Sequence, residues 1–310
     1  MSIAVVSLNP CIDRQVTVLG FVYGGLNRVQ EVGRYASGKG INVCAALANL
    51  GQNPLCTGIN FSQNGAFITN ALDEWGVKHD FVTVDGAVRI NIKLYDTTTG
   101  TMTELNQPGC FVPEADLAQL YTKIKNIDAQ ILVLSGSMPA GVPAGFYKQL
   151  CEIWPGKVIL DAEGEALITA LTGGKPPFCI KPNLYELESC FGVKLPTKED
   201  IAAFCKKLLH EYKLGIICVS MGADGALLVS HGGAFFMPGL DLTVRGLQGA
   251  GDAMVAGLAC GLIKNAQEPV LLQMASAAAA ASIVREGSLM CTKEDYKNFL
   301  QRYKSRVQLI

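Results

Sequence analysis

The sequence predicts an α/β fold in which helices flank a central, mostly parallel sheet and a small antiparallel sheet is inserted. Short apolar runs at 131–134, 158–160 and 216–219 each end in a polar or glycine-containing turn, and helix-like stretches at 143–152 and 163–171 follow the first two. Repeated strand–loop–helix units favour parallel strands covered by helices on both faces. In such sheets ligands bind beyond the carboxyl ends of the strands, so the polar residues there are the candidates for chemistry.

Two segments, about 11–35 and 81–106, show a different pattern, in which polar and apolar residues alternate without helical periodicity. In the clearest stretch Arg89, Asn91 and Lys93 share one face of a strand, and the apolar residues between them share the other. These segments predict a small antiparallel β lid inserted in a single domain that spans residues 1–310. Such a sheet would cover an active site or pair with a second subunit.

Composition excludes several classes of protein. A formal net charge of -1 argues against a nucleic-acid partner, which needs a strongly basic face. The 11 cysteines have no CxxC spacing and lie mostly in apolar segments, which indicates free buried thiols and a cytoplasmic protein; a disulfide framework or a zinc site is the alternative. The start of the chain lacks the pattern of a signal peptide. The apolar stretch 270–284 is too short to span a bilayer and predicts a buried helix, so we expect no membrane partner.

The run Gly249-Ala250-Gly251-Asp252 leads into an apolar, proline-free stretch at 252–262, which predicts a glycine-rich loop that opens a helix. Unpaired N–H groups at such a helix start form an anion site together with the helix dipole. A carboxylate there can take the proton of an attacking hydroxyl while the N–H groups stabilise a transferring phosphoryl group. Asp252 is therefore the candidate catalytic base. The alternative is that Asp252 only caps the helix.

Two cationic elements lie upstream. The run at 37–42 places Lys39 between two glycines at the start of a predicted helix; it lacks the Walker A spacing but suits a substrate oxyanion. The alternative is a solvent-exposed lysine in a turn. The strand face that carries Arg89 and Lys93 suits a phosphate or a polyol, and its alternative is an ordinary solvated face.

Polar residues follow two further strands. Asn183 and Glu186 are three positions apart at the start of a predicted helix and can hold a hydrated Mg²⁺ through water. The alternative is a capping box with Asn183 as the N-cap. The run 220–226 begins at Ser220, and its glycines allow close approach of a nucleotide phosphate; the alternative is a tight turn.

Short motifs spread along the chain, at 8–13, 27–29, 38–43, 89–93, 134–139, 181–183, 222–226 and 249–252, carry a family resemblance. In this order they resemble the ribokinase-like (PfkB) carbohydrate kinases, over essentially the whole chain. Within that family the sequence is most similar to 1-phosphofructokinases and tagatose-6-phosphate kinases. The resemblance implies a ribokinase-like fold whose β lid often forms homodimers.

The resemblance also implies roles at the acceptor and catalytic sites. Asp13 would hold sugar hydroxyls, and Asp252 would be the base. The anion hole would be formed by Gly249, Ala250 and Gly251. The phosphosugar site would be lined by Gly38, Lys39, Asn42, Arg89, Lys93 and Asn106.

On the donor side, the resemblance implies ATP as the phosphoryl donor and Mg²⁺ as the cofactor. The residues that would contact ATP are Lys181, Asn183, Ser220, Gly222 and Gly225. Glu186 would act on Mg²⁺ indirectly, through water.

The implied activity is phosphoryl transfer from ATP to a hydroxyl of a ketohexose monophosphate. Fructose 1-phosphate is the favoured acceptor, and tagatose 6-phosphate is the alternative. The run Gly246-Leu247-Gln248 departs from the family, which usually has a hydroxyl residue two or three places before the catalytic glycine. This departure bears on any monovalent-cation site and leaves a different class open, a sugar-phosphate-binding protein with impaired catalysis. Turnover of ATP with a panel of phosphosugars separates the two.

Overall fold

A ten-stranded sheet forms the body of the computed structural model, which describes residues 2–243, 246, 248–285 and 290–310. In spatial order its strands are β14 (Gln308–Leu309), β13 (Gly233–Pro238), β12 (Gly225–Ser230), β11 (Ile216–Ser220), β10 (Cys179–Ile180), β9 (Lys157–Asp161), β8 (Ile131–Ser135), β1 (Ile3–Ser7), β4 (Leu55–Gln63) and β5 (Lys78–Ala87). Adjacent strands run parallel from β11 to β5, and β12, β13 and β14 add an antiparallel edge. The predicted α/β class with a mostly parallel sheet is confirmed.

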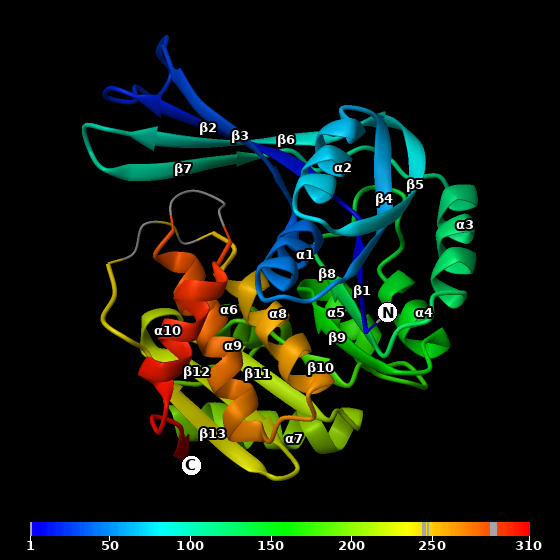
Figure 1. The fold of residues 1–310 in the computed structure, drawn as a ribbon, viewed down its shortest axis with the longest axis vertical. Helices are drawn as coiled ribbons and strands as arrows, with labels where there is room; N and C mark the ends of the chain where they lie inside the picture. The colour runs from blue at the N-terminus through cyan, green and yellow to red at the C-terminus, as the bar shows by residue number, and fades with distance from the viewer. Residues whose placement is uncertain (1, 244–245, 247, 286–289) are drawn as a thin grey trace.

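Helices cover both faces of this sheet (Figure 1). The first layer contains α1 (Lys39–Asn49), α2 (Gly65–Glu74), α8 (Ala250–Ile263), α9 (Glu268–Ile283) and α10 (Lys293–Tyr303). The second contains α3 (Glu114–Lys125), α4 (Phe146–Ile153), α5 (Gly164–Leu171), α6 (Leu184–Phe191) and α7 (Lys198–Tyr212). The central strand β1 reads as a continuous apolar run because it is buried on both faces.

The helices α8 and α9 pack closely because their sequences are rich in small residues. A Cβ added at Gly257 of α8 would lie 2.7 Å from Cα of Ala275 in α9, so only glycine permits this approach. Both helices are almost entirely buried, and α8 lies between α9 and α1. The stretch 270–284 is therefore a buried helix, as predicted. Within the described residues, none of the helices combines the length and the apolar character that crossing a membrane requires.

A second, four-stranded sheet projects from the body (Figure 1). Its strands are β3 (Gln30–Ser37), β2 (Cys11–Val18), β6 (Arg89–Asp96) and β7 (Thr101–Asn106), in this spatial order. The pairs β2–β3 and β6–β7 are antiparallel hairpins, whereas the central pair β2–β6 is parallel because the two hairpins lie side by side in the same direction. Residues 81–87, which we expected in this lid, instead extend β5 of the large sheet.

Eleven free thiols are present, and nine of them are buried. The predicted buried thiols therefore match the structure. Within the described part of the chain, His, Cys, Asp and Glu side chains form no group of three that could hold a metal ion.

Candidate functional site

Neighbouring strands of the large sheet bring polar side chains together at their carboxyl ends. Ser135 ends β8 opposite Asp161, which ends β9, and Lys181 directly follows β10. Ser135 donates a hydrogen bond from Oγ to Oδ2 of Asp161 over 3.1 Å. Nζ of Lys181 lies 3.3 Å from Oδ1 of Asp161. Since Asp161 and Lys181 are both buried, the register of the parallel strands assembles an ion pair inside the protein.

Lys39, the first residue of α1, adds a second cation to Asp161. Its Nζ lies 3.5 Å from Oδ2 of Asp161, and this carboxylate raises the pKa of Lys39 above its ordinary value. Burial raises the pKa of Asp161, but Lys181 and Lys39 outweigh that effect and hold the pKa of the carboxyl below its ordinary value. Lys39 is thus paired with a buried carboxylate at the start of a helix and does not lie in a turn, although its side chain is still 37% exposed.

Asp252 lies in the first turn of α8, and its proposed role as an N-cap is wrong. The N-cap is Gly249, and no side chain caps this helix. Instead Asn42 of α1 donates a hydrogen bond from Nδ2 to Oδ2 of Asp252 over 2.8 Å. Burial, and secondarily the charge of Asp161, raise the pKa of Asp252 from 3.8 to about 6. Asp252 is therefore ionised at neutral pH and is more basic than an ordinary carboxylate.

The loop before α8 has a backbone conformation that favours glycine. Gly249 has φ 75°, in the left-handed region. A Cβ at Gly251 would lie 3.4 Å from Nζ of Lys181, so this ammonium group lies directly beside the loop. The N–H groups at the start of α8, the helix dipole and Lys181 together suit an anion.

A polar cluster lies where the lid meets the body. Asn91 of β6 donates a hydrogen bond from Nδ2 to Oδ1 of Asp13 in β2 over 3.1 Å, and both residues are buried. The Arg89 guanidinium donates to the backbone oxygen of Asn9 over 3.2 Å and to that of Gln107 over 3.0 Å. This face of β6 is therefore largely buried, and the alternative of an ordinary solvated face is wrong.

Ser37 connects this cluster to the catalytic side of the site. In the register of β2 and β3, Ser37 lies opposite Cys11. Its Oγ donates a hydrogen bond to Oδ1 of Asn42 over 3.4 Å. Asn42 in turn donates to Asp252. Gly38 lies between Ser37 and α1, and its backbone approaches that of Pro10 so closely that a Cβ at Gly38 would lie 3.1 Å from Cα of Pro10.

Lys93 and Asn106 lie on neighbouring strands of the lid, where Asn106 of β7 pairs with Asn91 of β6. Nζ of Lys93 forms an ion pair with Oε2 of Glu104 over 2.6 Å. Glu104 also accepts hydrogen bonds from Gln248 over 2.9 Å and from Asn106 over 3.4 Å. Asn106 is exposed and borders a groove on the lid. The Gln248 contact joins the lid to the loop before α8.

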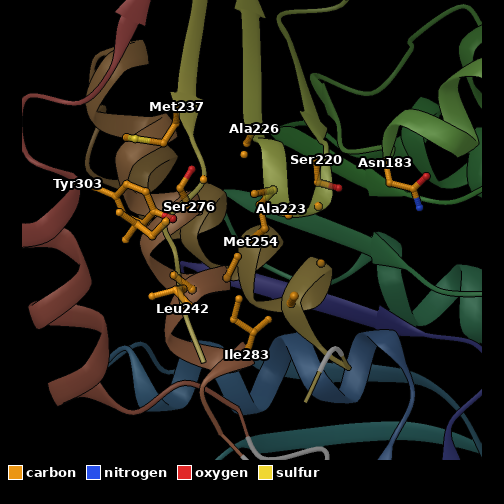
Figure 2. A pocket seen from close by; sticks show the side chains of 18 of the residues that line it. Asn183, Ser220, Ala223, Ala226, Met237, Leu242, Met254, Ser276, Ile283 and Tyr303 are labelled. Carbon is orange, nitrogen blue, oxygen red and sulfur yellow. The ribbon is translucent and has the colours of Figure 1, made fainter. Parts of the chain in front are cut away.

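A cavity of about 570 Å³ opens beside this loop (Figure 2). Its lining includes polar and small residues, namely Asn183, Ser220, Gly222, Gly225, Ala250 and Gly251. It also includes apolar side chains, among them Met237, Leu242, Met254, Ile283 and Tyr303. The predicted donor residues after β10 and β11 thus meet the predicted anion hole at a single cavity. The run at 220–226 combines a short 3₁₀ turn at Gly222–Asp224 with the start of β12.

Asn183 and Glu186 form the capping box that we considered as the alternative to a metal site. Oδ1 of Asn183 accepts a hydrogen bond from the Glu186 N–H over 2.7 Å, and Oε2 of Glu186 accepts one from the Asn183 N–H over 2.9 Å. At these two residues the structure therefore shows the capping box, and among the described residues no group of three His, Cys, Asp or Glu side chains could hold a metal ion.

Comparison with known proteins agrees with this arrangement. The family model for pfkB family carbohydrate kinases matches residues 2–295. The chain belongs to the pfkB family of carbohydrate kinases. Membership of this family implies ATP as the phosphoryl donor.

Several relatives in this family match most of the chain. The 1-phosphofructokinase of Rhodobacter capsulatus is 36% identical over 83% of this chain and 83% of its own length. That of Bacillus subtilis is 34% identical, with 84% of this chain and 85% of its own length covered. The tetrameric inhibited form of phosphofructokinase-2 from Escherichia coli has a TM-score of 0.90 at 25% identity and covers 97% of this chain and 99% of its own.

Sequence reasoning missed Asp161 as a member of this pfkB-family site. Its position at the end of an apolar strand was a usable signal, because polar residues at strand ends were the stated candidates. What the sequence did not reveal is that β8, β9 and β10 are neighbours and that α1 brings Lys39 beside them. Together these make Asp161 the common partner of Ser135, Lys39 and Lys181. Of the run Gly246-Leu247-Gln248, Leu247 lies outside the described residues.

Proposed function

We propose that this chain transfers the γ-phosphoryl group of ATP to the free primary hydroxyl of fructose 1-phosphate, forming fructose 1,6-bisphosphate. The observation that carries the proposal is the position of Asp252: a buried carboxylate with a raised pKa at the start of α8, beside both the donor cavity and the chain of polar contacts that leads to Asp13. Two relatives with the name 1-phosphofructokinase, at 34% and 36% identity, support the choice of acceptor.

In the proposed reaction the acceptor hydroxyl gives its proton to Asp252 as its oxygen attacks the γ-phosphorus. The bond between the γ-phosphorus and the bridging oxygen breaks, and ADP leaves. The N–H groups of Gly249, Ala250 and Gly251 stabilise the charge on the transferring group. Lys181, held against this loop by Asp161, adds a positive charge at the same place.

The acceptor is positioned by groups on the lid and on α1. The Asp13 carboxylate, itself held by Asn91, accepts hydrogen bonds from sugar hydroxyls. Lys39 and Arg89 supply positive charge for the phosphate that the sugar already carries, and Arg89 presents a planar set of donors that suits phosphate oxygens. Gly38, Lys93 and Asn106, which pairs with Asn91 across the lid, complete this side of the proposed site.

On the donor side, we propose that Asn183, Ser220, Gly222 and Gly225 contact ATP. Mg²⁺ would be bound by the phosphates and by water, and Glu186 would contact the ion indirectly, through a water molecule. The ion would neutralise phosphate charge during transfer.

A coupled assay of ADP release tests the proposal. Fructose 1-phosphate, fructose 6-phosphate, tagatose 6-phosphate and the free sugars are compared at fixed ATP and Mg²⁺. We expect the highest kcat/KM with fructose 1-phosphate and almost no turnover of free sugars, because these lack the anchored phosphate. A higher kcat/KM with tagatose 6-phosphate would assign that acceptor instead. Binding of a phosphosugar without ADP release would identify a sugar-phosphate-binding protein with impaired catalysis.

We also propose that the chain forms a homodimer through the β lid. The segment that connects β2 to β3 in the lid exposes large apolar side chains. Among them are Leu19, Tyr23 and Leu26, which are 84%, 96% and 81% exposed. Several large apolar side chains exposed on one segment are typical of a protein interface. Light scattering after gel filtration should give the mass of a dimer for the wild type and of a monomer for Leu26→Asp. Val270→Asp, at an exposed apolar position of α9, is the control that should remain dimeric.

The free thiols suit the reducing conditions of the cytoplasm, which we propose as the location of the protein. Expression with a fluorescent tag tests this, and a periplasmic or extracellular signal would contradict it.

A further inference from the structure

One buried thiol lies among the polar groups that hold the acceptor, and the proposed reaction does not use it. Cys11 of β2 is 2% exposed. Its Sγ donates a hydrogen bond to Oδ1 of Asp13 over 3.5 Å and accepts one from Nδ2 of Asn91 over 3.2 Å. Asn91 also donates to the same Oδ1 over 3.1 Å. Oδ1 of Asp13 is therefore held by two donors, and the thiol is one of them.

The register of the lid places a second polar group beside this thiol. β2 lies between β3 and β6, and Cys11 is opposite Ser37 of β3. The Ser37 hydroxyl forms a hydrogen bond with the Cys11 side chain, and its Oγ also lies 3.4 Å from Oδ1 of Asn42. Asn42 in turn contacts Asp252. All of these side chains are buried, so an unbroken set of contacts leads from Asp13 to the proposed base.

The Cys11 thiol keeps its proton at neutral pH. Burial, and secondarily the charge of Asp13, raise the pKa of Cys11 from 9.0 to about 12. A thiolate at this place would add a second negative charge beside a buried carboxylate. The thiol is therefore a hydrogen-bond donor and a poor nucleophile, which suits a role in holding its neighbours.

We propose that Cys11 and Ser37 are positioning residues that hold the Asp13 carboxylate at a fixed place relative to Asp252. This inference rests on the proposed function, because it takes Asp13 to hold the sugar and Asp252 to be the base. The attacking hydroxyl must lie within hydrogen-bond distance of the base, and a misplacement of about 1 Å can cost about 10²-fold in rate. Loss of either contact should therefore slow transfer to the sugar without weakening the binding of ATP.

Four single variants separate this role from simple packing. Cys11→Ala removes the thiol, whereas Cys11→Ser keeps one donor and one acceptor at the same position. Ser37→Ala breaks the same set of contacts one step further along. Cys205→Ala is the matched control, because Cys205 is also a buried thiol with a pKa raised to about 12. It lies in α7, which packs against β11 and β12 at the end of the molecule away from the lid (Figure 1).

The experiment measures kcat and KM for ATP and for the phosphosugar that the wild type uses best, together with the Tm of each variant. For Cys11→Ala and for Ser37→Ala we expect kcat/KM for the sugar to fall about 3- to 10-fold, while the KM for ATP stays within about two-fold. The double variant should lose little more than the worse single variant, because both changes break the same set of contacts. Cys11→Ser should recover most of the loss. Cys205→Ala should lower the Tm and leave kcat/KM within about two-fold.

Three results would overturn the inference. The first is a kcat/KM for the sugar in Cys11→Ala that lies within two-fold of the wild type. The second is a Cys11→Ser variant no more active than Cys11→Ala, which would show that the hydrogen bonds of the thiol do not matter. The third is a double variant whose loss is the product of the two single losses, which would make the two contacts independent. If the wild type phosphorylates no sugar phosphate, the proposed function fails as well; if it does, only the role of Cys11 and Ser37 is at stake.

Discussion

Asn42 donates a hydrogen bond from Nδ2 to Oδ2 of Asp252 over 2.8 Å, and so joins the first turn of α1 to the first turn of α8. The two residues are 210 positions apart in the chain. Both are buried, and Asp161 lies close enough for its charge to raise the pKa of Asp252. Burial and Asp161 therefore disfavour the ionised form of the proposed catalytic carboxylate. Asn42 favours that form, and so do the charges of Lys39 and Lys181.

The first prediction concerns Asp252 itself. Asp252→Asn keeps the size of the side chain but removes the proton acceptor. We expect kcat to fall by about 10²- to 10⁴-fold while the KM values for ATP and phosphosugar stay within a few-fold. Steady-state ADP release measures both. Retention of more than a tenth of the activity would exclude Asp252 as the base.

The second prediction is the pH dependence of the wild type. Asp252 accepts a proton only when it is ionised, and its pKa is about 6. We therefore expect kcat/KM to rise with pH through about 6 and to level off above it, since kcat/KM reports the ionisation of the free enzyme. A profile that is flat from pH 5 to 8 would contradict this assignment.

The third prediction concerns Asn42. Its hydrogen bond stabilises the ionised carboxylate and lowers the pKa of Asp252. Asn42→Ala removes that donor, so the acid limb of the kcat/KM profile should move to higher pH. The measurement is the same pH series as for the wild type, with Asn49→Ala at the end of α1 as a control that leaves the limb in place. An acid limb that stays at the wild-type pH in Asn42→Ala would be inconsistent with the predicted coupling.

The fourth prediction concerns Asp161, which acts in the opposite sense. Its negative charge raises the pKa of Asp252, so Asp161→Asn should move the acid limb to lower pH. The substitution also leaves Lys39 and Lys181 without their carboxylate, and removal of one partner from a buried pair destabilises a protein by about 3–5 kcal/mol. We expect a lower kcat and a lower Tm. An acid limb at or above that of the wild type would refute the coupling of the two aspartates.

The fifth prediction is that the proposed base destabilises the fold. The pKa of Asp252 is raised from 3.8 to about 6, so the ionised group is less favourable in the folded than in the unfolded chain. This cost is absent below pH 3.8 and complete above about pH 6. Asp252→Asn should therefore raise the free energy of unfolding by about 3 kcal/mol at pH 8 but not near pH 4. Urea denaturation at the two pH values measures the difference, and an equal effect at both would contradict it.

Much of the fold was predictable because the relevant signals are local. The apolar run of β1 and the small residues of α8 and α9 indicate that these elements are buried. The run Gly249–Asp252 predicts both a loop and the start of a helix. The lid was found from alternation alone, but its parallel central pair was not, because period-2 patterns do not encode which hairpin lies beside which.

The sequence by itself determined which side chains are available: Asp252 after a glycine loop, Lys39 at a helix start, and Asn183 with Glu186 in a capping box. Only the tertiary structure decided how they interact. Strand order makes Asp161 the partner of two lysines, helix packing brings Asn42 to Asp252, and the register of the lid places Cys11 opposite Ser37. The physical reason is that burial and charge act through space, so the pKa of a carboxylate depends on neighbours that the chain brings together only when it folds.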